Sequence, residues 1–234
     1  EQKKSAASFF PKARLVYYSG ESDVMPAAMR LAYKFDIYAQ EPVSRQLVFV
    51  DAVNGKILGK REVIHETNAP GTAQTGYSGT QNITTDYTGA AYRLRETGRG
   101  NGINTYNMQT GTNYFAAVDF TDADNNWNNV NVAQDEYATD AHWGTEKTYD
   151  YFFTTFNRNS IDNLGMELNS YVHYSTGFFN AYWDGDRMTY GDGDGAHGNK
   201  PLTTLDICGH EITHGITEFT SALVYSYESG AMNE

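Results

Sequence analysis

Two histidines and a glutamate in the stretch HEITH have the types and the spacing of a metal-dependent hydrolytic site: His210, Glu211 and His214. Residues four apart on a helix lie about 40° apart around its axis, so the two imidazoles project from one face and can grip one zinc ion. Glu211 lies about 100° from His210, where its carboxylate reaches a water on the metal rather than the metal itself. The arrangement is H-E-x-x-H, two neutral nitrogen ligands and a carboxylate base. The alternative is a solvated helix face with two unrelated histidines.

A catalytic zinc ion needs a third protein ligand and one open position for water. The last residues, ESGAMNE, can supply that ligand. Ser229 can cap a new helix, and Glu234 falls about one turn into it. The alternative is an ordinary exposed glutamate, which spacing alone does not reject.

The element that must position the two histidines is a helix over 205–220. Thr203 or Thr204 can cap it, and Asp206 lies in its first turn, where the helix dipole favours a carboxylate. An apolar stripe marks its packed face: Leu205, Cys208, Ile212 and Phe219. Cys208 is the one cysteine, which excludes an internal disulfide, and it is predicted to be a small buried hydrophobe rather than a nucleophile.

The preceding chain predicts a second helix and many strands. The segment 134–156 has helical periodicity, with one face formed by Ala138, His142, Thr145, Tyr149, Phe152 and Phe156. Alternation predicts a small antiparallel meander from strands at 14–18, 29–37, 46–52 and 56–64, with a hairpin turn at Asn54–Gly55 and a helical turn near 26–29. The segment 67–82 is rich in Gly, Thr, Asn and Pro and predicts a linker. His142 and His173 are predicted to be packed or hydrogen-bonded histidines.

Charge divides the chain into two parts. The net charge is −12; residues 1–66 hold ten Lys/Arg and eight Asp/Glu, whereas residues 67–234 hold seven and twenty-one. An acidic chain without a basic patch argues against nucleic acid as a partner and suits cation binding. No apolar run approaches the ~20 residues of a membrane span. EQKKSAASFF lacks the apolar core of an intact secretion signal, so we expect the numbering to start after one has been removed.

The segment 210–234 (HEITHGITEFTSALVYSYESGAMNE) resembles the zinc-binding segment of the thermolysin-like metallopeptidases. Upstream, 180–195 is similar to the family's edge strand and loop, and 140–152 to its long first helix. The segment 13–66 resembles the C-terminal part of the family's propeptide, a module known as PepSY. Together these segments cover most of the chain.

The resemblance implies an α+β fold in three parts. Residues 1–66 would be an antiparallel PepSY-like propeptide remnant, and 67–82 a linker and the start of the mature enzyme. Residues 83–234 would be the β-rich N-terminal lobe of the catalytic domain, ending in the HExxH helix. The helical C-terminal lobe, which follows the third ligand in the family, is expected to be absent, so this chain alone is expected to be weakly active or inactive.

The resemblance also implies site residues. His210, His214 and Glu234 would be the zinc ligands and Glu211 the general base. The other implied roles are a partner steadying a zinc histidine (Asn233), a hydrogen-bond donor to the oxyanion (Tyr225), the strand that binds substrate backbone (Asn180 and Ala181) and a calcium ligand (Asp206). Without the family, Tyr225 would be read as a packed aromatic.

Two acidic loops have oxygen ligands at spacings that suit calcium. Asp122 and Asp124 alternate in TDADNNW. For these two residues, a calcium site and a plain loop are equally favoured. Asp192 and Asp194 alternate in GDGDG, where a tight Gly-Asp turn is favoured over calcium. Neither loop has the terminal glutamate of an EF-hand.

These observations predict a secreted zinc-dependent endopeptidase, present as a proenzyme fragment, that acts on proteins or peptides. Zinc would polarise the scissile carbonyl, and Glu211 would take the proton of the attacking water. The family implies a bulky apolar residue just after the cleaved bond, structural calcium, and association of the propeptide with the catalytic lobe. The alternative is a truncated, non-catalytic binding or inhibitory module that acts on other proteases through its PepSY-like part.

Overall fold

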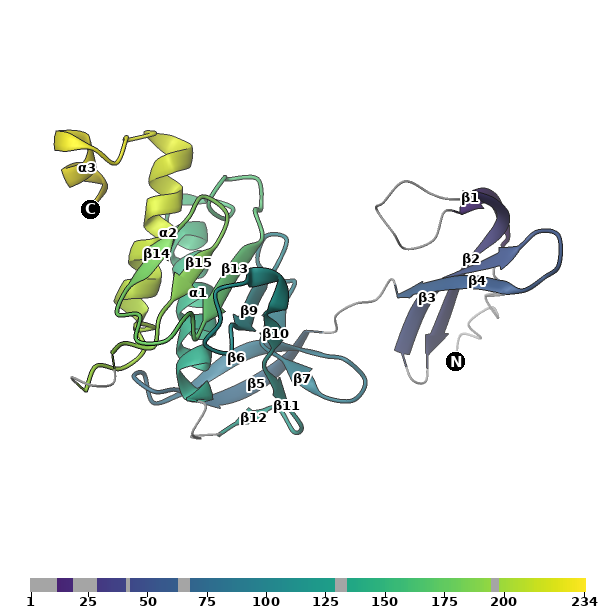
Figure 1. Ribbon diagram of the computed structural model, residues 1–234, viewed down its shortest axis with the longest axis horizontal. Helices are drawn as coiled ribbons and strands as arrows, with labels where there is room; N and C mark the ends of the chain where they lie inside the picture. Colours follow the sequence, from purple (N-terminus) through teal and green to yellow (C-terminus); the bar gives the residue numbers. More distant parts are fainter. Residues whose placement is uncertain (1–11, 19–28, 41–42, 63–67, 129–133, 195–197) are drawn as a thin grey trace, which may run out of the picture. The chain divides into compact units, whose positions relative to one another are not determined.

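The computed structural model describes residues 12–18, 29–40, 43–62, 68–128, 134–194 and 198–234 (Figure 1). The chain forms two compact units, Glu1–His65 and Glu66–Glu234. Helices and strands are mixed along the second unit, so the α+β class predicted from the sequence is confirmed at that level.

Unit 1 contains a four-stranded antiparallel sheet in the order β1-β2-β3-β4. Its strands are β1 (Arg14–Tyr18), β2 (Arg30–Gln40), β3 (Val43–Asp51) and β4 (Ile57–Glu62). The predicted meander is therefore confirmed. Gly55 in the turn between β3 and β4 has a φ of 72°, which is the positive φ that the Asn-Gly signal predicted. The helical turn expected near 26–29 lies outside the described residues except for Met29.

Unit 2 contains two sheets. The first has the order β11-β7-β6-β5-β12, with strands β5 (Asn68–Gln74), β6 (Thr80–Tyr87), β7 (Tyr92–Arg93), β11 (Thr121–Asp122) and β12 (Asn126–Trp127). The second has the order β10-β9-β13-β15-β14, with β8 also paired to β9; its strands are β8 (Arg95–Glu96), β9 (Ile103–Asn107), β10 (Val118–Asp119), β13 (Leu168–Val172), β14 (Ala181–Trp183) and β15 (Met188–Tyr190). Strands β9, β13 and β15 run parallel, and β14 runs antiparallel to β15. Within the described chain, β14 pairs with β15 alone and is an edge strand.

Two long helices pack beside each other and against these sheets (Figure 1). The helical elements are α1 (Asp135–Phe156), α2 (Leu205–Thr220), α3 (Tyr227–Asn233) and the 3-10 turn η1 (Tyr114–Ala116). Helices α1 and α2 approach closely because Gly144 faces Cys208: a Cβ built on Gly144 would lie 2.9 Å from the Cys208 sulfur. The core of unit 2 joins both helices and both sheets, so α2 is fixed from several directions.

Two expectations differ from the structure. The segment 67–82 was expected to be a linker, but β5 and the start of β6 lie within it and pair with each other. Gly71 and Ala73 are the inward-facing residues of β5, and such small side chains give no hydrophobic alternation to detect. On α1, the predicted face is buried from Ala138 to Tyr149, but Phe156 in the last turn is 61% exposed, so the buried face ends before the helix does.

Candidate metal centre

Helix α2 has the bounds that the sequence predicts, and it presents the two histidines on the face opposite its core contacts. Its buried residues are Cys208, Glu211, Ile212 and Gly215. Thr204 occupies the N-cap position, but its hydroxyl donates a hydrogen bond to Asp206 Oδ1 at 2.5 Å instead of accepting one from the helix. That bond lowers the pKa of Asp206 below its ordinary value.

The orientation of His214 is set by Asn233. The Asn233 side-chain nitrogen donates to the carbonyl oxygen of Leu223 at 2.9 Å, which turns the amide oxygen toward His214. Nδ1 of His214 lies 2.8 Å from that oxygen. Because an amide oxygen only accepts, the network places the proton on Nδ1 and leaves a lone pair on Nε2. His214 therefore has the tautomer that a metal ligand needs.

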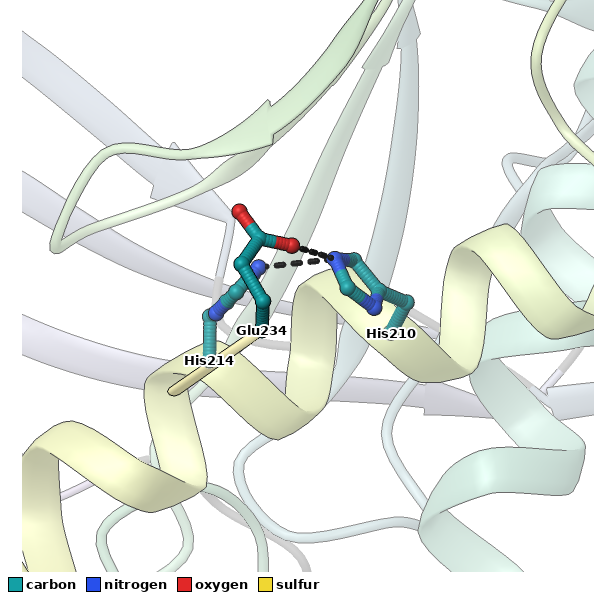
Figure 2. A group of neighbouring side chains, drawn as sticks. All are labelled: His210, His214 and Glu234. Carbon is teal, nitrogen blue, oxygen red and sulfur yellow. Dashed lines mark hydrogen bonds and ion pairs between the residues drawn. The ribbon is translucent and has the colours of Figure 1, made fainter. Parts of the chain in front are cut away.

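Three ligand atoms converge on one point (Figure 2). Nε2 of His210 lies 2.8 Å from Nε2 of His214 and 3.4 Å from a carboxylate oxygen of Glu234. All three ligand atoms lie within 4.8 Å of one another, and in the described part of the chain this is the only such group of three or more His, Cys, Asp or Glu residues. Figure 2 shows the two imidazoles rising from α2 and the carboxylate of Glu234 reaching over them.

This ligand set fits a zinc ion. Zinc–nitrogen bonds of about 2.0–2.1 Å at tetrahedral angles place two ligand atoms roughly 3.3 Å apart. The observed separations of 2.8 Å and 3.4 Å lie on either side of that value. A cation bound between these atoms would be stabilised by the Glu234 carboxylate and by lone pairs of the ring nitrogens.

The third ligand comes from a helix that begins earlier than predicted. Ser229 was expected to cap it, but α3 begins at Tyr227, with Ser226 at the N-cap position. The Ser229 hydroxyl instead donates to the carbonyl of Val224. Glu234 is the residue that ends the helix, and its N–H donates to the carbonyl of Gly230 at 3.1 Å. The side chain of Glu234 thus points back to α2 from the last turn of α3.

Glu211 lies beside the metal ligands and is shielded from water. It is 5% exposed, and burial raises the pKa of its carboxyl group, while the two neighbouring histidines act in the opposite direction. It lines a cavity of about 620 Å³ together with His210, His214 and Glu234. A carboxylate in that position can exchange protons with a molecule bound in the cavity.

The same cavity contains the other predicted residues. Tyr225 lines it from the loop between α2 and α3, and its ring centroid lies 6.0 Å from that of His214. Tyr225 is 64% exposed, so it is not the packed aromatic of the alternative interpretation. Asn180 and Ala181 line the opposite wall at the start of β14. The cavity therefore lies between helix α2 and the edge strand β14.

Comparison with known proteins agrees with this geometry. The family described as "Thermolysin metallopeptidase, catalytic domain" matches residues 70–218, which include His210, Glu211 and His214. This chain belongs to the thermolysin metallopeptidase family. Tyr225, Asn233 and Glu234 lie beyond the matched residues, so their assignment depends on the geometry and on the resemblance of the segment.

Curated relatives match this thermolysin-family chain over 80–96% of its length. A bacillolysin of Brevibacillus brevis is 39% identical over 96% of this chain and 40% of its own. A bacillolysin of Bacillus cereus is 35% identical over 96% of this chain and 43% of its own. A transglutaminase-activating metalloprotease of Streptomyces mobaraensis is 39% identical over 80% of this chain and 24% of its own. The chain therefore spans about two fifths of the length of the bacillolysins it matches.

This family member is also similar to solved structures. The precursor of protealysin, a metalloproteinase from Serratia proteamaculans, is 33% identical and covers 56% of this chain and 38% of its own. Its TM-score of 0.47 is too low to define a shared arrangement of elements.

Two residues of the thermolysin-family site were not singled out from the sequence. The indole N–H of Trp183, on β14, donates to a carboxylate oxygen of Glu218, on α2, at 2.9 Å. Both residues line the cavity and close it between helix and strand. Glu218 follows His214 by four residues, so helical spacing already placed it on the ligand face.

The calcium candidates of this family member are not gathered into one group. Asp122 Oδ1 accepts from the backbone N–H groups of Asp124 and Asn126 at 3.0 and 3.2 Å. Asp206 is exposed and is bonded to Thr204. Calcium at Asp122, Asp124 and Asp206 therefore stays a prediction. In the second loop, Asp192 bonds His173 and Asp194 accepts from Asn199, and the preference for a tight turn over calcium stays a prediction.

Proposed function

We propose that this protein is a secreted, zinc-dependent endopeptidase. The proposal rests on one observation: two imidazole nitrogens and the Glu234 carboxylate converge at a cavity in which Glu211 is the buried, adjacent carboxylate. Membership of the thermolysin metallopeptidase family supports it. In the described chain, no helix is long and apolar enough to cross a membrane.

The chemistry follows from the positions of the side chains. His210, His214 and Glu234 would hold a zinc ion, which would supply a Lewis acid that polarises a carbonyl and acidifies a water molecule. Glu211 would accept the proton of the attacking water and deliver it to the leaving amine; burial raises the pKa of its carboxyl group, which favours this proton transfer. Tyr225 donates a hydrogen bond to the oxyanion that develops on the carbonyl.

The substrate is a polypeptide bound as an added strand. Strand β14 is an edge strand beside the cavity, and Asn180 and Ala181 offer their polar groups to a peptide backbone. Trp183 and Leu223 add apolar surface to the same cavity. This surface supports the preference of the family for a bulky apolar residue after the cleaved bond.

The test is zinc content and peptide hydrolysis in the full protein and two variants. Glu211→Gln is expected to keep one zinc ion per chain and to lose hydrolysis by roughly 10²–10⁴-fold, the usual contribution of a general base. Glu228→Gln is the matched control, because Glu228 is an exposed glutamate on α3. Hydrolysis that survives Glu211→Gln would remove Glu211 from the mechanism. A protein without zinc and without hydrolysis would refute the function.

Unit 1 supports a second, associated role. Leu15 and Tyr17 on β1 lie directly opposite Tyr33 and Leu31 on β2, so their side chains share one face of the sheet. All four are exposed, between 40% and 75%. We propose that this apolar face binds a protein surface, with the catalytic unit of the protein as its partner and the zymogen state as the result. Inhibition of unrelated proteases by unit 1, with no effect on this enzyme, would instead favour the non-catalytic inhibitory module.

A further inference from the structure

Three strand ends meet at one edge of the six-stranded sheet, next to the substrate strand. Strands β13 and β15 run parallel, with Tyr171 opposite Thr189, so both end at this edge. Strand β14 runs the other way and starts there, with Ala181 opposite Tyr190. His173 directly follows β13, and Asp192 follows β15 by two residues.

A partly buried side-chain bond joins two of these ends. Nδ1 of His173 lies 2.6 Å from Oδ1 of Asp192. His173 is 3% exposed, and its ring packs at 5.7 Å from that of Phe120. Its Nε2 is buried, with no hydrogen-bond partner in the described chain. A carboxylate only accepts, so Nδ1 carries the proton, and Asp192 is the one group that satisfies this imidazole.

The turn that carries Asp192 has little stiffness of its own. Asp192 stands between Gly191 and Gly193, and glycine restricts the backbone less than any other residue. Gly193 has a φ of 75°. At Gly191 a Cβ would lie 2.0 Å from the carbonyl oxygen of Phe178, so only glycine allows this close approach. The side chain of Asp192 therefore adds an anchor to a turn that is otherwise held by backbone bonds, among them the bond from the N–H of Leu202 to the carbonyl of Gly191 at 3.1 Å.

The Gly191–Gly193 turn also binds the segment that leads into β14. The N–H of Gly191 donates to the carbonyl of Asn180 at 3.0 Å, and the N–H of Gly193 donates to the carbonyl of Phe178 at 3.1 Å. Asn180 and Ala181 line the cavity next to the metal ligands. The path from the buried imidazole to the substrate-facing backbone thus consists of one side-chain bond and two backbone bonds.

We propose that His173 and Asp192 are positioning residues for substrate: their bond fixes the Gly191–Gly193 turn and, through it, the edge at which β14 binds a peptide. The proposal rests on the proposed function of the cavity. Neither residue lines the cavity or belongs to the metal-ligand group. Loss of the bond should leave zinc and the catalytic groups in place and weaken the hold on extended substrates.

The experiment compares three variants of the full protein. Asp192→Ala removes the bond, and Asp192→Asn keeps an oxygen that can accept from Nδ1. Asp162→Ala is the control, because Asp162 also restrains a loop, by accepting from the N–H groups of Leu164 and Met166 at 2.8 and 2.9 Å. Hydrogen exchange of the amides in 178–183 is measured together with zinc content, kcat and KM on a long peptide.

Asp192→Ala is expected to speed exchange in 178–183 about tenfold and to raise KM about tenfold, as the loss of a charged hydrogen bond implies, with kcat and zinc little changed. Asp192→Asn should bring both the exchange rate and KM most of the way back to the wild-type values, and Asp162→Ala should change neither the exchange rate nor KM. Unchanged exchange in Asp192→Ala would overturn the anchor. Faster exchange with an unchanged KM would overturn its role in substrate positioning. A wild-type protein that does not hydrolyse peptides would refute the proposed function and with it the substrate role, while the exchange data would still decide the anchor.

Discussion

Helices α2 and α3 both supply residues of the proposed zinc site, but they are held in different ways. Helix α2 has 16 residues, packs against α1 and the sheet, and contributes Cys208 and Ile212 to the core. Helix α3 has seven residues, of which Gly230 alone is buried. Tyr227 and Met232 on α3 are 91% and 74% exposed. One side of the site is therefore fixed by packing, and the other is fixed mainly by polar contacts.

Asn233 is the centre of those polar contacts. It joins α3 to the carbonyl of Leu223 and, by its oxygen, to His214 on α2. The residue that orients a ligand is thus also one that holds α3 in place. Because the ligand from α3 is brought to the metal by the same contacts, zinc binding and the local order of α3 should be coupled. The predictions below test this difference, from the largest expected effect to the smallest.

Removing core volume from α2 should have the largest effect on stability. Ile212 is 2% exposed and belongs to the central cluster of unit 2. Ile212→Ala should lower the free energy of unfolding by about 3 kcal/mol, because a buried isoleucine leaves a cavity. Unfolding in denaturant measures this free energy in the wild type and the variant. A loss below about 1 kcal/mol would mean that α2 is not anchored by its core face.

The scaffold under α2 should also lose stability in acid. His142 on α1 is fully buried between Thr84 and Thr105, and burial lowers its pKa to about 4. The unfolded chain, with an ordinary pKa near 6.5, then binds more protons than the folded chain between about pH 4 and 6.5. The neutral His142 therefore contributes about 3 kcal/mol to the free energy of unfolding above pH 6.5, and this contribution is lost as the pH falls to 4.

The measurement is the pH dependence of the unfolding free energy in wild type and His142→Gln. Burial raises the pKa values of Glu96 and Glu146 nearby, which act in the opposite direction, so only the difference between the two proteins isolates the histidine. The wild type should lose more stability than the variant between pH 6.5 and 4. Parallel pH curves would contradict a buried neutral His142.

A change on the α3 side should act on zinc more than on global stability. Asn233→Ala removes the partner of His214, and loss of such a partner typically reduces metal affinity about 10–100-fold. Competition with a chelator measures the affinity, and Glu228→Gln on the same helix is the control. An Asn233→Ala variant with wild-type zinc affinity would show that His214 is oriented by something else.

The smallest effect is expected for an apolar side chain of α3. Met232→Ala should change the free energy of unfolding by less than about 0.5 kcal/mol, because Met232 is largely exposed. It is the counterpart of Ile212→Ala. If both variants lost the same stability, the difference between the two helices would disappear.

The sequence predicts α2 more accurately than α3, and the contrast between packing and polar contacts explains why. The bounds of α2 and the placement of both histidines follow from an apolar stripe and a four-residue spacing, which are local signals. The position of Glu234 depends on the turn after α2, where Ala222 and Tyr227 adopt φ values of 46° and 52°. Positive φ at such residues has no local signature, so the start of α3 could not be predicted from its sequence.

Long-range contacts explain the other differences. Strand β5 was not recognised because its inward residues are small and its stability comes from pairing with β6. The Trp183–Glu218 bond joins residues that are distant in the sequence, and only the fold brings them together. The relative positions of side chains on one helix can be predicted from the sequence, whereas bonds between a helix and an edge strand cannot.

The central claim is that α2 and α3 together bind one zinc ion. Anomalous diffraction at the zinc edge, on crystals of the zinc-loaded protein, tests it most directly. The account predicts one peak per chain, about 2.0–2.2 Å from Nε2 of His210, Nε2 of His214 and a carboxylate oxygen of Glu234. A peak bound by the two histidines without Glu234, or a peak elsewhere in the chain, would contradict it.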